Sequence, residues 1–388
     1  MNERRDTAPT LILAGGGHAH VEVLRQFGLK RPEGIRIVLI SPDSHTPYSG
    51  MIPGLLAGHY TWDDCHIDVR PLCDVAGAEF VSTRIVDIDP AARHVRCADG
   101  RSYRFDVLSL DVGSTPDLQA VPGAAEHAIP VKPVAAFLEA WQQLVAGITR
   151  EGAPRRLAVV GGGAGGVEVA LAMRYRLGGA ESADAPQIAL VTTDLMATHP
   201  RRVQALLERA LIDHRVTLVR DCRVTQVTAG VVHGASGEHI PADLIVWVTG
   251  ASAPAWIRQS GMHVDVRGFV AVNDHLQSTS HPFVFAAGDV ATMTSGPLAK
   301  AGVFAVRQGP VLAGNLRRYL APQPLRPFRP QRRFLSLMST GGRHAVASWA
   351  GLGWQGRWVW RWKDRIDRTF MRTYHVASQA DSRATRSR

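Results

Sequence analysis

The chain has 388 residues, of which 45% are hydrophobic and 20% charged, with 37 Gly, 23 Pro and 4 Cys. This length predicts two or three domains with a large apolar core, and the ordinary composition excludes a disordered, collagenous or disulfide-stapled protein. The net charge of +10 is concentrated at one end, because residues 315–388 contain 16 Arg and Lys against 3 Asp. The first 314 residues carry a net charge of −3, so a near-neutral body precedes a strongly basic C-terminal segment.

The cysteines and the first residues argue against several functional classes. No CxxC or CxxxxC pair occurs among Cys65, Cys73, Cys97 and Cys222, so we expect no zinc cage, no dithiol redox motif and no metal site. No apolar run of the signal-peptide type precedes residue 10, and no apolar stretch is long enough to span a bilayer. We therefore expect a cytoplasmic protein.

Two glycine-rich turns, 146 residues apart, each follow a short apolar run. The run 10–14 leads into Gly15-Gly16-Gly17-His18-Ala19-His20, and the run 157–160 leads into Gly161-Gly162-Gly163-Ala164-Gly165-Gly166. Each pattern predicts a buried strand, a tight turn and a helix.

This arrangement is that of a dinucleotide-binding fingerprint. The first Gly permits the turn, the second lets a pyrophosphate approach the backbone, and a small third residue lets the helix pack on the strand. The second copy has Gly161, Gly163 and Gly166 in these places, whereas the first has Gly15, Gly17 and the bulkier His20. A duplicated packing turn that binds no nucleotide is the alternative.

Three further apolar strands are predicted to end at glycine turns. One ends at Asp111-Val112-Gly113, the second at Thr249-Gly250, and the third at Gly288-Asp289. Strands of this kind deliver their carboxyl ends to a ligand crevice. Asp289 can accept hydrogen bonds from a sugar-like chain there.

The order of these features over residues 10–318 resembles the two-dinucleotide-binding-domain flavoproteins, the pyridine nucleotide–disulfide oxidoreductase superfamily. The resemblance implies an α/β fold with two Rossmann-like domains. An NAD(P)H-binding domain, 126–264, would be inserted into an FAD-binding domain made of 8–125 and 265–318. A small α+β basic segment, 319–376, and a disordered tail, 377–388, would follow.

The resemblance also implies cofactor-binding residues. Gly15, Gly17 and Asp289 would contact the phosphates or ribityl chain of FAD, with Asp111, Val112, Gly113 and Gly288 nearby. Gly161, Gly163 and Gly166 would hold NADH or NADPH. The remaining cofactor-binding candidates are His20, Ser41, Ser49, Met51, Thr192, Thr249, Gly250 and Ala301.

Within the superfamily the chain looks most like the type II NADH dehydrogenase and sulfide:quinone reductase branch. The segment Ser44–Gly54, Lys132 and the run Lys300–Gly309 look closer still to flavoproteins fused to, or encoded beside, selenide, water dikinase. No thiol lies between Ser41 and Asp64, and thiol redox chemistry at the flavin requires one. We therefore expect hydride transfer from nicotinamide to FAD, followed by electron transfer to a quinone or another small acceptor.

Four residues are candidates for catalysis by the same resemblance. Glu168 would relay protons or orient the nicotinamide, although a helix N-terminal acid is the structural alternative. Lys132 and Lys300 would place a cation near the flavin, and Gln308 would lie near a quinone. Ser41 and Thr192 stand where a ribose-binding acid is expected, with Asp43 and Asp194 two residues later, so the choice between NADH and NADPH stays open.

The basic segment predicts two strands, 334–338 and 344–350, and an amphipathic helix, 357–374. Five arginines form one stripe of this helix: Arg357, Arg361, Arg365, Arg368 and Arg372. The adjacent apolar face consists of Trp358, Val359, Trp362, Ile366 and Phe370. A cationic stripe beside Trp suits an anionic membrane surface; a helix docked on the body is the alternative, and nucleic acid is a weaker one.

Two other functions stay open at this level. One is a soluble flavoenzyme acting on a small inorganic or selenium-linked substrate, and the other is a non-catalytic FAD-bound protein that docks a partner. The sequence leaves the oligomeric state open.

Overall fold

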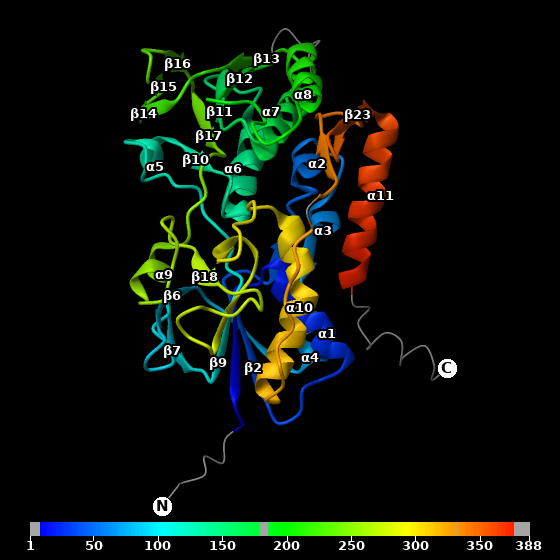
Figure 1. Ribbon diagram of the computed structural model, residues 1–388. Helices are drawn as coiled ribbons and strands as arrows, with labels where there is room; N and C mark the ends of the chain where they lie inside the picture. Colours follow the sequence, from blue (N-terminus) through cyan, green and yellow to red (C-terminus); the bar gives the residue numbers. More distant parts are fainter. Residues whose placement is uncertain (1–7, 179–184, 332, 376–388) are drawn as a thin grey trace, which may run out of the picture.

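The computed structural model describes residues 8–178, 185–331 and 333–375. These residues form two α/β units, each built on a five-stranded parallel sheet, and a C-terminal segment that packs against both units (Figure 1). The α/β fold class with Rossmann-like sheets, predicted from the sequence, is confirmed. The predicted disordered tail, 377–388, lies outside the described residues.

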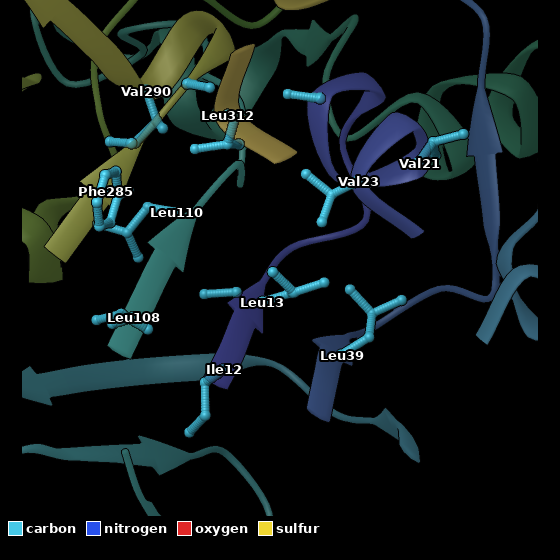
Figure 2. Close-up of a cluster of buried hydrophobic side chains, with 14 of the residues drawn as sticks. Ile12, Leu13, Val21, Val23, Leu39, Leu108, Leu110, Phe285, Val290 and Leu312 are labelled. Atoms are coloured by element: carbon cyan, nitrogen blue, oxygen red, sulfur yellow. The ribbon is translucent and has the colours of Figure 1, made fainter. Parts of the chain in front are cut away.

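The first sheet has the strand order β19-β9-β1-β2-β5, and all neighbouring strands are parallel. Its strands are β1 (Thr10–Ala14), β2 (Arg36–Ser41), β5 (Ala78–Ser82), β9 (Val107–Leu110) and β19 (Val284–Ala286). Helix α1 (His18–Leu29) packs against both α4 (Val69–Ala76) and α10 (Gly302–Leu320). Strands buried on both faces are almost continuously apolar, and Figure 2 shows this core, with Leu13, Leu39, Leu110 and Phe285 of the strands, Val23 of α1 and Leu312 of α10.

The second sheet repeats this architecture with the order β10-β17-β11-β12-β13. Its strands are β10 (Ile129–Pro130), β11 (Arg156–Val160), β12 (Gln187–Val191), β13 (Val216–Val219) and β17 (Leu244–Trp247), and its helices are α6 (Val134–Gly147), α7 (Ala164–Arg176) and α8 (Arg201–Asp213). Each unit also carries a three-stranded antiparallel sheet. These are β6 (Ile85–Asp89), β7 (His94–Cys97) and β8 (Ser102–Arg104), and β14 (Val224–Thr228), β15 (Val231–Gly234) and β16 (His239–Pro241).

Strand β19 shows how the two units are connected. It follows the whole second sheet in the chain, yet it pairs with β9 of the first sheet, with Val284 opposite Leu108. The second unit is therefore an insertion into the first, and the segment from β19 onward brings Gly288 and Asp289 to the carboxyl edge of the first sheet.

Short elements connect the larger ones. They are β3 (His45–Pro47), α2 (Ile52–Leu56), α3 (Trp62–Cys65), β4 (His66–Asp68), α5 (Ala124–His127), α9 (Ala255–Gln259), β18 (Val270–Val272), a 3-10 turn at Gly288–Val290, and β20 (Ala291–Met293). Of these, β3 pairs with β4 and β18 with β20.

The C-terminal segment is an antiparallel sheet followed by one helix. It contains β21 (Ser336–Ser339), β22 (Ala345–Trp349), β23 (Leu352–Gly356) and α11 (Arg357–Tyr374). The helix has the predicted bounds, but the prediction of two strands missed β23. Within the described ranges, no helix combines the length and apolar composition needed to cross a membrane.

The face of α11 that the sequence pattern marked as apolar is only partly the buried one. Val359 and Phe370 pack inward, whereas Trp358, Trp362 and Ile366 are exposed by 52%, 39% and 41%. The inward face instead includes Lys363 and Asp367, whose opposite charges lie 2.6 Å apart and allow both side chains to be buried. The helix is thus docked on the body. It also exposes an aromatic ridge, which consists of Trp358 and Trp362 with the aliphatic Ile366 beside them.

Candidate functional site

The first glycine turn lies between β1 and α1. Gly15 has a φ of +92°, and a Cβ there would lie 2.6 Å from the carbonyl oxygen of Asp111. A Cβ on Gly17 would collide with the carboxylate of Asp111. Glycine is therefore required at both positions, and the turn brings the end of β1, the start of α1 and the turn after β9 to one edge of the sheet.

Asp111 caps the start of α1. Its Oδ2 accepts hydrogen bonds from the backbone N–H groups of Ala19, at 2.8 Å, and of His20, at 3.1 Å. Burial raises the pKa of Asp111 to about 7, although these two hydrogen bonds act in the opposite direction. Two of the four N–H groups at the start of the helix thereby have a partner within the chain. Val112 and Gly113 follow Asp111 directly, and Gly113 has a φ of +72°.

The His20 side chain links helix α1 to strand β9 and to the first glycine turn. Its fully buried ring lies with Nδ1 2.6 Å from the Gly15 carbonyl oxygen and Nε2 2.8 Å from Ser109 Oγ. Burial lowers its pKa to about 4, so the ring is neutral at pH 7. The imidazole fills the space that a small third residue would leave, so its side chain does not support the predicted cofactor contact.

A cavity of about 280 Å³ lies at the carboxyl end of β2. Asp43, Ser44 and Ser82 contribute to its lining, whereas Ser41 is buried beside Gly16. A Rossmann-like unit places the ribose of its dinucleotide at this end of its second strand. Asp43 is therefore better placed for a contact with the ribose than Ser41 is.

The turn after β19 carries an ion pair. Asp289 Oδ2 lies 3.0 Å from Lys132 Nζ and accepts a hydrogen bond from Ser114 Oγ at 3.2 Å. Lys132 Nζ also donates to Ser114 Oγ at 3.2 Å. The structure thus brings two predicted residues together and adds Ser114, whose only sequence signal was its place directly after Gly113.

Gln308 and Lys300 support the same turn. Gln308 is buried, and its Oε1 accepts a hydrogen bond from the Gly288 backbone N–H at 2.7 Å. Lys300 Nζ donates to the Ala291 carbonyl oxygen at 2.6 Å and lies 3.8 Å from the centroid of the Phe269 ring. Burial lowers the pKa of Lys300 to about 8. Both side chains are held by the protein, so the geometry favours positioning roles over direct contact with an acceptor.

His18, directly after the first glycine turn, has an unusual environment. Its Nε2 is buried without a hydrogen-bond partner among the described residues. Burial lowers its pKa to about 4, with Asp289 and Lys132 acting on it electrostatically. A buried polar atom of this kind, beside the first glycine turn, fits a ligand group that would complete its hydrogen bonding.

The second glycine turn satisfies the fingerprint at each position. Gly161 has a φ of +131°, a Cβ on Gly163 would meet no atom within 4 Å, and a Cβ on Gly166 would overlap the Gly161 carbonyl oxygen. The three glycines therefore make the turn, leave the backbone open to a ligand, and allow α7 to pack closely. Thr249 borders Gly161, Gly250 has a φ of +72°, and Thr192 Oγ1 donates to the Asp194 carbonyl oxygen at 2.8 Å.

Glu168 faces the C-terminal segment. Its Oε1 accepts a hydrogen bond from the Ser339 backbone N–H at 2.7 Å. Burial raises its pKa to about 7, although the nearby Lys363 acts to lower it. Glu22, at the equivalent position of the repeat, is instead paired with Arg25 at 2.8 Å. The two acids are therefore not equivalent, and only Glu168 has a pKa raised to near neutrality.

The ion pair of α11 reaches the loop between β3 and α2. Lys363 Nζ donates to the Gly50 carbonyl oxygen, and Tyr48 Oη donates to Asp367 Oδ1 at 3.2 Å. This loop contains the predicted Ser49 and the buried Met51, and a Cβ on Gly302, next to Ala301, would lie 3.2 Å from Ser49 Oγ. Lys363, Asp367 and Tyr48 were missed from the sequence; the only signal was a Lys and an Asp four residues apart.

The cysteines are buried and carry no disulfide. All four are free thiols, and burial raises the pKa of both Cys65 and Cys73 to about 12. Because the thiolate is the reactive form, these groups are inert at neutral pH.

Comparisons with known proteins agree with this geometry. A family model described as pyridine nucleotide-disulphide oxidoreductase matches residues 9–309. An NADH dehydrogenase-like protein of Mycobacterium tuberculosis is 30% identical over 234 residues, which is 58% of this chain and 58% of that protein. The demethylphylloquinone reductase NdbB of Synechocystis is 25% identical over 371 residues, 90% of this chain and 89% of that protein.

Solved structures show the same fold. The NDH2 structure from Plasmodium falciparum in complex with NADH has a TM-score of 0.78 and 13% identity, covering 94% of this chain and 97% of that one. The sulfide:quinone oxidoreductase of Aquifex aeolicus has a TM-score of 0.76 and 17% identity, covering 97% and 94%.

Proposed function

Because this chain belongs to the pyridine nucleotide-disulphide oxidoreductase family, we propose that it reduces a quinone or another small acceptor with electrons from NADH or NADPH. FAD used with NAD(P)H is the cofactor set of that family. One observation carries the proposal: two strand–glycine turn–helix units lie at the carboxyl edges of two parallel sheets, and the second leaves its backbone open to a ligand at Gly163. The inert thiols support transfer without a redox-active disulfide.

Each cofactor has residues that would hold it. Gly15 and Gly17 would face the diphosphate of FAD, and Asp289 would accept hydrogen bonds from its ribityl hydroxyls while Lys132 balances the charge. Gly161 and Gly163 would face the diphosphate of the nicotinamide dinucleotide. When bound, FAD supplies an acceptor for hydride and a donor of two electrons.

Glu168 is the proposed proton-handling group. A carboxyl group with a pKa of about 7 both holds and releases a proton near neutral pH. Lys363 and Asp367 of α11 set its electrostatic environment. Gln308 and Lys300 keep the Gly288–Asp289 turn in place.

The acceptor is proposed from the relatives. A relative that aligns over 90% of this chain is named a demethylphylloquinone reductase, which supports a quinone. The likeness of Ser44–Gly54 to flavoproteins encoded beside selenide, water dikinase stays a prediction, with a selenium-linked substrate as the alternative. The aromatic ridge of α11, beside Arg357, Arg361 and Arg365, supports a peripheral position on an anionic membrane surface.

Steady-state turnover tests the proposal. FAD-loaded protein is supplied with NADH or NADPH and with either a short-chain ubiquinone or ferricyanide, before and after treatment with iodoacetamide. We expect quinone reduction with one of the two nucleotides and no loss of rate after alkylation. Turnover that alkylation abolishes would contradict the disulfide-independent route, and turnover with ferricyanide alone would contradict the quinone.

A further inference from the structure

A cavity of about 570 Å³ lies between the second unit and the C-terminal segment. Its walls come from the ends of α7 and α8, the turn between β21 and β22, and the residues around the start of α11. None of the residues proposed above to bind a cofactor or handle protons lines it. Its volume falls in the range of small-molecule sites, roughly 300–1,000 Å³.

The cavity is separate from the dinucleotide site. Helix α8 ends at Asp213, directly before β13 begins at Val216, so the cavity lies at the amino edge of the second sheet. The glycine turn at Gly161 lies at the opposite, carboxyl edge, where a Rossmann-like sheet binds its dinucleotide.

The lining of this cavity is basic. It contains Arg209, Arg343 and Arg357, and its one carboxylate, Asp213, accepts a hydrogen bond from Arg209 Nε at 2.9 Å. Arg343 lies over the Trp360 ring, with the guanidinium carbon 5.6 Å from the ring centroid. Within the described ranges, neither Arg343 nor Arg357 forms an ion pair, so two guanidinium groups are left without a counter-ion at the cavity.

Neutral donors complete the lining. Burial lowers the pKa of both His214 and His344 below the ordinary value for histidine. His344 Nδ1 lies 3.0 Å from Thr340 Oγ1, which fixes the orientation of the ring. The Thr340 hydroxyl is used within the protein, because it donates to the His344 carbonyl oxygen at 3.2 Å. Imidazole N–H groups beside guanidinium groups are suitable donors to an oxyanion.

We propose that this cavity binds a small phosphorylated anion, held mainly by the guanidinium groups of Arg343 and Arg357. The planar guanidinium group pairs with phosphate oxygens through two parallel hydrogen bonds. The phosphate can come from a soluble phosphate ester or from the headgroup of an anionic phospholipid, because Arg357 begins the helix that carries the exposed Trp358.

Calorimetric titration tests this site on FAD-loaded protein saturated with NAD⁺, which keeps both dinucleotide sites filled. The probes are inorganic pyrophosphate and, in a second arm, a short-chain phosphatidylglycerol below its micelle concentration. We expect saturable binding of one equivalent, weakened about tenfold or more in Arg343→Gln and in Arg357→Gln, since each loses a charge-assisted bidentate contact. The matched control is Arg202→Gln, an exposed arginine of α8 that lines neither the cavity nor the ridge of α11.

The two arms identify the source of the phosphate. Tighter binding of phosphatidylglycerol than of pyrophosphate assigns the site to a lipid headgroup, and the reverse assigns it to a soluble phosphate ester. The proposal is overturned if neither probe binds, or if Arg202→Gln weakens binding as much as the two cavity variants. The three arginines are exposed, so we expect the circular dichroism melting curves of all three variants to match that of the wild type.

Discussion

At the residue scale, glycines of one motif have different physical roles. A Cβ on Gly166 overlaps a backbone oxygen, whereas a Cβ on Gly163 enters open space. Gly166 allows α7 to pack closely on β11, and Gly163 leaves space for a ligand to approach the backbone. Substitutions at Gly166 should therefore reduce stability, and substitutions at Gly163 should reduce ligand binding.

We predict that Gly163→Val folds normally, because Gly163 has a φ of −75°, which valine tolerates. The variant should lose NAD(P)H binding, because the valine side chain fills the space that Gly163 leaves open. Its free energy of unfolding should change by less than about 0.5 kcal/mol, while the KM for the nucleotide rises more than tenfold. Gly166→Val should lower the free energy of unfolding by about 1–3 kcal/mol through overpacking. Urea unfolding and steady-state kinetics measure both effects, and equal destabilisation by the two variants would contradict this assignment.

Glu168 gives a second prediction, on pH. Burial raises its pKa in the folded state to about 7, above its ordinary value near 4.5. Between these values the folded chain binds a proton that the unfolded chain releases, so this group makes stability fall as pH rises from about 4.5 to 7. Glu168→Gln should flatten that slope.

Urea unfolding of wild type and Glu168→Gln across that pH range measures the difference. Glu22→Gln is the matched control, since the pKa of Glu22 is lowered by hydrogen bonds from Arg25 and Gln26 despite its burial. Identical slopes for wild type and Glu168→Gln would show that the carboxyl group of Glu168 is not the titrating group.

At the scale of the element, α11 is attached to the body by polar contacts. Tyr60 Oη donates to Asp364 Oδ1 at 2.8 Å, and Tyr374 Oη donates to Glu22 Oε2 at 3.1 Å. At the centre, Lys363 and Asp367 lie 2.6 Å apart with side chains exposed by only 8% and 6%. Because both side chains are buried, each charge needs the other as its counter-ion.

We predict that Lys363→Met lowers the free energy of unfolding by about 3–5 kcal/mol, because it leaves the Asp367 carboxylate buried without a counter-ion. The double variant Lys363→Met, Asp367→Leu should recover most of that loss. Urea unfolding of the single and double variants tests the coupling. Additive losses in the double variant would contradict it.

The same helix shows what the sequence reveals and what it does not. Its bounds follow from local spacing of arginine and apolar residues, and the structure has the same bounds. Its buried face depends on Tyr48 and Gly50, which lie more than 300 residues earlier in the chain, so a helical wheel does not identify it. Strand β23 was missed because Leu352–Gly356 has glycine at two of five positions, and pairing with β22 decides its conformation.

The candidate site also contains residues that the sequence predicts and residues that only the structure reveals. The glycine turns are local patterns, and the structure gives Gly15, Gly161, Gly163 and Gly166 the expected geometry. The partners of Asp289, Gln308 and Glu168 arise from long-range packing that no local pattern encodes. For that reason Ser114, the ion pair of α11 and the hydrogen bonds of His20 to Gly15 and Ser109 were missed.

At the scale of the whole molecule, α11 brings part of the excess positive charge together with two exposed tryptophans, Trp358 and Trp362. Arg357, Arg361 and Arg365 are exposed beside the aromatic ridge. Tryptophan and arginine are favourable at the boundary between headgroups and acyl chains. The proposed position on an anionic membrane rests on this side of the molecule.

We predict that the double variant Trp358→Ser, Trp362→Ser binds phosphatidylglycerol vesicles several times more weakly than wild type, because it removes most of the apolar area of the ridge. Trp349→Ser, which removes a 49% exposed tryptophan from β22, is the control and should bind as wild type does. Vesicle flotation measures both. Equal binding by wild type and the double variant would contradict a role of the ridge.

The insertion of the second unit into the first is the feature on which the proposed activity depends. It places two dinucleotide-binding edges in one molecule, with Lys132, which follows β10 of the second sheet, paired to Asp289 of the first unit. Electrons would therefore pass from one cofactor to the other within a single chain.

Anaerobic rapid mixing of FAD-loaded protein with NADH or NADPH tests this claim most directly. We predict that one of the nucleotides bleaches the flavin absorbance far faster than background, and that Gly163→Val retains FAD but loses this reaction. Flavin that neither nucleotide bleaches faster than background, in protein that binds FAD, would contradict the account.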